Sequence, residues 1–263
     1  MKIKAIICDM DGVLWKDQEP IGELFAYFEH LKKVPIQYIF ATNNSTKTPE
    51  QYQQKLATFN VSISANQVIT SGATVAFELA KKYPQGGPVY IIGEEGLIKA
   101  LEEYGFFHSE SNVIAVVGGM EHNLNSEKLD KASSLIKKGA DFFFSNMDST
   151  FPTPHGIIPG AGALLAKLEK SSGTKAIVAG KPEPYMLLQA IHRLKTQPEE
   201  TLVIGDRLET DILGGKNAGC KTALVLSGIS SEKDILKQSI YPEVVANNLG
   251  ELIKKMEQNQ WKI

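Results

Sequence analysis

Two carboxylates follow directly on a buried apolar run near the start of the chain. In the stretch IICDMDGVLW, residues 6–8 are typical of the end of a core strand, whereas Asp9 and Asp11 are acids and Gly12 permits a tight turn. An Asp-x-Asp-Gly stretch also occurs as an ordinary turn, because Asp and Gly both favour turns. The chemical alternative is paired catalysis, in which one carboxylate attacks an electrophile while the other transfers protons.

Three further apolar runs end in polar residues of other types. Thr42 and Asn43 end YIFATN, Lys181 follows AIVAG, and Asp206 ends TLVIG. Taken singly, these residues have ordinary explanations: a helix N-cap, a solvated loop charge, and an acid that complements a helix dipole. Taken together, they predict a site, because the carboxyl ends of parallel strands lie on one edge of a sheet and ligands bind there. We therefore expect four strand ends to converge in one crevice.

The acids of this set predict a metal ion. Asp9, Asp11 and Asp206 concentrate negative charge that needs a cation to offset it, and hard oxygen ligands left partly to water suit Mg²⁺. In this interpretation one of the paired acids Asp9 and Asp11 attacks phosphorus to give an aspartyl phosphate, and the other protonates the leaving oxygen and later activates water.

The other residues predict a phosphate group. Thr42 supplies a hydroxyl, and the backbone N–H groups of Asn43 and Asn44 precede a helix that PEQYQQKL, from residue 49, predicts. Lys181 adds a positive charge. These groups together could hold phosphoryl oxygens.

The elements that must position these residues alternate along the chain as short strands and helices. Near-continuous apolar strands separated by helices predict a parallel sheet covered on both faces, that is, an α/β protein with a doubly wound sheet. The strands of the middle segment end in GEEG, GGME and SNMD, which share no consistent set of polar residues. We therefore expect the catalytic edge of the sheet to come from the segments on either side of this middle segment. The predicted strands are IKAIICD, IQYIFATN, GPVYIIG, SNVIAVVGG, ADFFFSN, TKAIVAGK, TLVIGD and KTALVL.

Composition narrows the function further. The 263 residues suffice for one large or two modest domains, and a net charge of −2 offers no basic field for nucleic acid or an anionic membrane. Two cysteines are too few for a disulfide framework or a cysteine-based zinc site. The N-terminus has no secretory pattern, and no apolar stretch approaches the roughly 18 residues of a membrane helix. We expect a cytoplasmic protein.

The motifs also resemble a known family. DMDGVLW, ATNNS, AGKPEPYM and GDRLETDILGGKNAG are similar, in order, to the four motifs of the haloacid dehalogenase-like superfamily of phosphatases. TNNST, the TSG at residues 70–72, PGAGALLAKLE and GKPEPYM resemble the NagD and p-nitrophenyl phosphatase subfamily. The similarity spans nearly the whole chain.

This resemblance implies roles for individual residues. Asp9 would be the nucleophile and a metal ligand, Asp11 the general acid/base with its backbone carbonyl on Mg²⁺, and Asp206 the remaining metal ligand. Asp211 would support the last motif from behind the metal. The residues implied to hold phosphate are Thr42, Asn43 and Lys181.

The family also implies a domain organisation. A Rossmann-like catalytic core would comprise residues 1–74 and 159–263, and an α/β cap, residues 75–158, would be inserted into it and select the substrate. The helix GAGALLAKLEKSSG would return to the core. In the cap loop SNMDSTFPTPHG, candidate substrate contacts are Asn146, Asp148 and Phe151, although Phe151 and His155 are equally explained as a loop aromatic and a surface histidine.

The leading hypothesis is a Mg²⁺-dependent phosphatase acting on phosphomonoesters of small metabolites, such as sugar phosphates, nucleoside monophosphates, phosphoglycolate or p-nitrophenyl phosphate. One alternative is a phosphomutase, which the long α/β insertion disfavours. A second is a non-catalytic protein that binds a phosphorylated ligand on the same fold, which the intact acids and lysine disfavour. The sequence leaves the substrate and the oligomeric state open, a homo-oligomer included.

Overall fold

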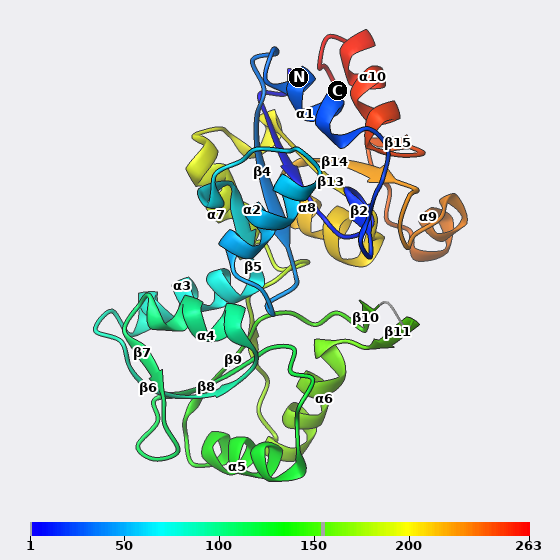
Figure 1. The fold of residues 1–263 in the computed structure, drawn as a ribbon. Helices are drawn as coiled ribbons and strands as arrows, with labels where there is room; N and C mark the ends of the chain where they lie inside the picture. The colour runs from blue at the N-terminus through cyan, green and yellow to red at the C-terminus, as the bar shows by residue number, and fades with distance from the viewer. Residues whose placement is uncertain (1, 154–155) are drawn as a thin grey trace. The chain divides into compact units, whose positions relative to one another are not determined.

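The computed structural model describes residues 2–153 and 156–263, which form two compact units. The first unit comprises residues 1–42, 50–69 and 181–263, and the second comprises residues 43–49 and 70–180. Each unit has a parallel sheet of its own (Figure 1). The predicted α/β class with parallel sheets is confirmed.

The sheet of the first unit has six strands in the order β15-β14-β13-β1-β4-β5. From β1 the chain adds strands first on one side and then on the other, so the order reverses between β1 and β13. In doubly wound folds this reversal is where ligands bind. The bounds are β1 Ala5–Cys8, β4 Gln37–Thr42, β5 Val68–Thr70, β13 Thr201–Gly205, β14 Lys221–Val225 and β15 Val244–Ala246.

Helices cover both faces of this sheet because alternate strand residues are apolar on each side. Ile6 and Cys8 face one cluster, shared with α1, α2 and α10, whereas Ile7 faces another, shared with α7. Two-residue strands β2 Trp15–Lys16 and β3 Glu19–Pro20 form a small hairpin after β1. The helices are α1 Leu24–Leu31, α2 Pro49–Thr58, α7 Tyr185–Leu194, α8 Leu213–Asn217, α9 Glu232–Gln238 and α10 Leu249–Gln258.

The second unit contains a five-stranded sheet in the order β12-β9-β8-β6-β7 and a hairpin of β10 and β11. Helices α3 and α4 pack on one face of this sheet, and α5 and α6 pack on the other. The strands are β6 Gly87–Ile92, β7 Phe106–His108, β8 Ala115–Gly118, β9 Asp141–Phe144, β10 Thr150–Thr153, β11 Gly156–Pro159 and β12 Ile177–Val178, and the helices are α3 Ser71–Lys82, α4 Glu95–Glu102, α5 Ser126–Lys137 and α6 Ala161–Ser172.

The structure corrects two expectations about the segment after residue 158. Helix α6, which we expected in the core, buries Leu164, Leu165 and Leu168 among apolar residues of β8, β9 and α5 in the second unit. Strand β12, from the run TKAIVAGK, pairs with β9 and not with the six-stranded sheet. Residues 159–180 therefore belong to the second unit, because their apolar side chains and strand edge are satisfied there.

No helix within residues 2–153 and 156–263 is both long enough and apolar enough to span a lipid bilayer.

Candidate active site

Asp9 stands at the reversal point of the six-stranded sheet. It follows β1 directly, and its backbone N–H donates to the carbonyl of Ile204 on β13 at 2.8 Å, which extends the parallel ladder by one residue. This hydrogen bond fixes the backbone of Asp9 at the carboxyl end of the central strand. Its side chain is 11% exposed.

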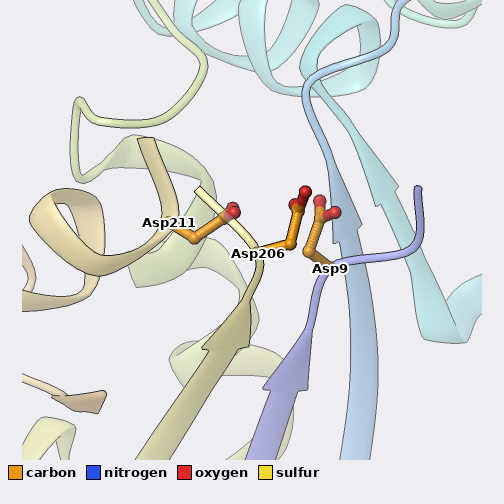
Figure 2. Close-up of side chains that lie close together, drawn as sticks. All are labelled: Asp9, Asp206 and Asp211. Carbon is orange, nitrogen blue, oxygen red and sulfur yellow. The ribbon is translucent and has the colours of Figure 1, made fainter. Parts of the chain in front are cut away.

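Two further acids meet Asp9 at this edge (Figure 2). Asp206 follows β13, and Asp211 lies in the helical turn Leu208–Ile212; one carboxylate oxygen from each of the three acids lies within 4.8 Å of the others. Asp206 and Asp211 are each 2% exposed. A backbone N–H binds each of them: Ile229 donates to Asp206 Oδ2 at 2.8 Å, and Arg207 donates to Asp211 Oδ2 at 3.1 Å.

Lys181 joins two of these acids. Its ammonium group lies 2.7 Å from Asp9 Oδ1, 2.6 Å from Asp211 Oδ1 and 2.9 Å from the carbonyl oxygen of Ala41. Its side chain is 2% exposed, so this is a buried ion pair and not a solvated loop charge. Lys181 therefore offsets part of the carboxylate charge and holds Asp9 and Asp211 in fixed orientations.

Burial is the largest single influence on the pKa values of the cluster. Loss of solvation raises the pKa of Asp9 well above its usual range, against the opposing charge of Lys181. Burial and the neighbouring charge of Asp211 raise the pKa of Asp206 to about 7. For Lys181, burial acts to lower the pKa, but the charges of Asp211 and Asp9 outweigh it and the pKa rises. The carboxylate charge thus exceeds what one lysine balances, which favours a bound cation.

Asp11 and Thr42 complete the predicted residues of the first unit. The Asp11 carboxylate accepts a hydrogen bond from the indole Nε1 of Trp15 at 2.7 Å. Thr42 is the last residue of β4 and is 2% exposed. One compact unit contains Asp9, Asp11, Thr42, Lys181, Asp206 and Asp211.

Asn43 and Asn44 group with the second unit, although they follow β4 directly. The Asn43 amide donates to Asp148 Oδ1 at 2.7 Å, and the Asn43 carbonyl accepts from the Asn146 amide at 2.7 Å. Asn44 Oδ1 accepts from both the backbone and the hydroxyl of Thr46. These side chains thus shape the loop after β4, and a role in holding phosphate stays a prediction.

The three candidate contacts of the second unit differ in exposure. Asn146 is 3% exposed, and its oxygen accepts from the backbone of Asp148 at 3.1 Å, so its amide supports the loop. Asp148 is partly exposed. Phe151 is also partly exposed and lies edge-on to the ring of His122, with centroids 5.5 Å apart. His155 lies outside the described residues.

Two supporting residues escaped the sequence interpretation. Trp15 follows Asp11 by four positions in the opening motif, a spacing at which contact is visible only once the turn between them is known. Ile229 binds Asp206 through its backbone, which no side-chain pattern reveals.

Comparison with known proteins identifies the family. A sequence profile described as haloacid dehalogenase-like hydrolase matches residues 6–107, and a second, described as HAD-hydrolase-like, matches residues 178–252. The chain is 35% identical to the 5′-nucleotidase YutF of Bacillus subtilis over 250 residues, 95% of this chain and 97% of the relative. The chain belongs to the haloacid dehalogenase-like hydrolase family. This hydrolase is also 32% identical to an acid sugar phosphatase of Staphylococcus saprophyticus, over 97% of this chain and 98% of the relative.

Solved structures of the family share its fold. The 4-nitrophenylphosphatase of Thermotoga maritima superposes with a TM-score of 0.91 at 34% identity, covering 96% of this chain and 97% of its own. NagD from E. coli K-12 gives 0.88 at 32% identity, covering 95% and 98%. A glycerol phosphate phosphatase of Mycobacterium tuberculosis in complex with magnesium gives 0.87 at 29%, covering 95% and 76%. The resemblance to the NagD and p-nitrophenyl phosphatase subfamily is confirmed.

Proposed function

We propose that this hydrolase is a Mg²⁺-dependent phosphatase that cleaves phosphomonoesters of small metabolites through an aspartyl-phosphate intermediate. The observation that carries the proposal is the buried cluster of Asp9, Asp206 and Asp211 around Lys181, at the reversal point of a parallel sheet. So much buried charge is costly for folding alone, and it suits a site that binds a cation and a phosphate.

The donor set fits magnesium. All three acids offer carboxylate oxygens, the ligands that Mg²⁺ prefers, and one oxygen of each lies within 4.8 Å of the others. Both oxygens of Asp211 already accept hydrogen bonds, from Lys181 and from the backbone of Arg207. Asp9 and Asp206 would therefore hold the ion, with the backbone carbonyl of Asp11, and Asp211 would support Lys181. Bound Mg²⁺ would neutralise phosphoryl charge.

The chain's own residues divide the chemistry into two steps. In the first, a carboxylate oxygen of Asp9 bonds to phosphorus, the bond from phosphorus to the ester oxygen breaks, and Asp11 gives that oxygen a proton. In the second, Asp11 takes a proton from water as the water oxygen bonds to phosphorus. The bond to Asp9 then breaks, which releases inorganic phosphate and restores the enzyme.

Phosphate contacts would come from three places. Lys181 supplies a positive charge beside Asp9, Thr42 supplies a hydroxyl at the end of β4, and Asn43 and Asn44 supply backbone N–H groups. The second unit would select the leaving group. The names of the relatives support a small substrate: a nucleotidase, a sugar phosphatase, a nitrophenyl phosphatase and a glycerol phosphate phosphatase. A cytoplasmic location and a homo-oligomer stay predictions.

A steady-state assay tests the proposal. We expect phosphate release from p-nitrophenyl phosphate with Mg²⁺, its loss on treatment with EDTA, and its return when Mg²⁺ is restored. Full activity in metal-free enzyme would contradict the metal site. Binding of phosphorylated ligands without release would favour a binding protein, and transfer of the phosphoryl group to a sugar hydroxyl in place of water would favour a phosphomutase.

A further inference from the structure

The side chain of Trp15 is completely buried and donates its only polar hydrogen to Asp11. The indole Nε1 lies 2.7 Å from Asp11 Oδ1, and the tryptophan side chain is 0% exposed. A buried indole N–H needs a hydrogen-bond acceptor, and here that acceptor is the carboxylate assigned to proton transfer.

Residues of α2 and its C-terminal end hold the indole ring in place. Tyr52 stacks on it with centroids 6.4 Å apart and planes 13° apart, and Phe59 packs at 6.0 Å. The ammonium group of Lys55 lies 4.1 Å from the centre of the ring. An indole contacted by two aromatic rings and a cation has little freedom to rotate, so its N–H points in one direction.

The backbone between Asp11 and Trp15 is equally constrained. The N–H of Gly12 donates to the carbonyl of Trp15 at 2.8 Å, and the N–H of Leu14 donates to the carbonyl of Met10 at 2.8 Å. Asp11 and Trp15 also form an isolated parallel bridge. The donor and the acceptor of the side-chain hydrogen bond therefore sit on one closed turn.

We infer that Trp15 is a positioning residue for Asp11. Its indole N–H fixes the carboxylate so that Oδ2 carries the proton delivered to the leaving oxygen. An indole N–H only donates, so the Oδ1 that binds it acts as an acceptor, and the proton of a general acid is left to Oδ2. This inference rests on the proposed function, in which Asp11 protonates the leaving group. It assigns to Trp15 a role beyond packing.

The role has a specific kinetic consequence. An alkoxide is a strong base and leaves poorly without a proton, whereas p-nitrophenolate is a weak base and leaves without one. Misplacing Asp11 should therefore slow phosphoryl transfer from an alkyl ester more than transfer from p-nitrophenyl phosphate. The ratio of kcat/KM for the two esters reports this step, because kcat/KM covers the reaction only up to the first irreversible step.

The test compares Trp15→Phe with wild type on glycerol 2-phosphate and p-nitrophenyl phosphate. We expect kcat/KM to fall about tenfold or more on the alkyl ester and less than about twofold on the nitrophenyl ester. Replacing Trp15 by benzothienylalanine, which keeps the ring shape but has sulfur in place of the N–H, should give the same pattern. This second variant decides the question if Trp15→Phe folds poorly.

Two control variants distinguish the positioning role of Trp15 from a simple loss of packing and from a failure of the proposed function. Phe59→Leu loosens the ring contacts of Trp15 but keeps its N–H. This variant should change kcat/KM for both esters by the same factor. Asp11→Asn should reproduce the alkyl-selective loss; if it does not, the role proposed for Asp11 fails. If Asp11→Asn is selective but both Trp15 variants slow the two esters equally, the proposed function stands and the positioning role of Trp15 is wrong.

Discussion

At the scale of single residues, Lys181 is a buried cation that is paired with two carboxylates. Its ammonium group contacts carboxylate oxygens of Asp9 and Asp211 and is 2% exposed. The sequence predicts a lysine at the active edge, and it predicts a phosphate contact. It does not predict the ion pair with Asp211, because the two residues are 30 positions apart and meet only through the turn that follows β13.

Replacing Lys181 should therefore damage both stability and catalysis. We expect Lys181→Ala to destabilise the fold by about 3–5 kcal/mol, because it leaves Asp9 and Asp211 buried without their cation. Phosphatase activity should fall more in Lys181→Ala than in Lys181→Arg, since arginine keeps the charge but not the compact ammonium geometry. Chemical denaturation and kcat on p-nitrophenyl phosphate measure the two effects. Unchanged stability in Lys181→Ala would contradict the buried ion pair.

At the scale of elements, the loop that follows β1 leaves room for Asp206 beside Asp9. Gly12 has a φ of +83°, and a Cβ atom there would lie 2.5 Å from Asp206 Oδ2. The sequence predicts a turn at Asp-x-Asp-Gly, because Gly favours positive φ. It does not predict that the same glycine must lack a side chain to admit Asp206, which comes from a different strand.

Gly12→Ala should therefore lose catalytic activity in addition to the stability that backbone strain costs. Gly219 is a matched control in the same unit, with a φ of +77° and only an ordinary contact of 3.4 Å from a Cβ to Pro198. We expect the left-handed backbone to cost each alanine variant about 1–2 kcal/mol of unfolding free energy. Only Gly12→Ala should also lower kcat, by displacing Asp206. Equal activity in the two variants would show that Asp206 tolerates the extra methyl group.

Strand partners were the least predictable feature of the elements. The run TKAIVAGK has the apolar character of a core strand, yet only Ile177–Val178 form a strand, and it pairs with β9 in the second unit. The short edge strands β5, β7 and β15 were not predicted, because three-residue runs carry little periodicity. Hydrophobic pattern gives the type of an element, whereas its partner depends on tertiary packing.

At the scale of the whole molecule, the chain divides its residues between two units. The motifs predict as site residues Asp9, Asp11, Thr42, Lys181, Asp206 and Asp211, all of which belong to the first unit. The boundary of the insertion could not be predicted, because the apolar face of α6 would fit a cluster in either unit. The structure buries that face with Phe142 and Phe144 of the second unit.

We predict that the second unit selects the substrate. Phe151→Ala should change the relative rates on a panel of phosphorylated metabolites by about tenfold, because a lost apolar contact with the leaving group affects some substrates more than others. Phe107→Ala is the matched control, since this phenylalanine is 57% exposed on the edge strand β7 of the same unit. It should leave the panel unchanged. One common factor for all substrates in Phe151→Ala would contradict the assignment.

Phosphorylation of Asp9 can be tested in the first turnover of Asp11→Asn, by following the release of p-nitrophenol. With Mg²⁺ present, the nitrophenyl ester needs no proton to leave, but water attack on the intermediate needs Asp11. We predict a rapid burst that approaches one p-nitrophenol per enzyme, followed by slow release, and no burst when Asp9→Asn is added to the same variant. An equal burst in the double variant, or steady release at the wild-type rate in Asp11→Asn, would contradict the covalent mechanism.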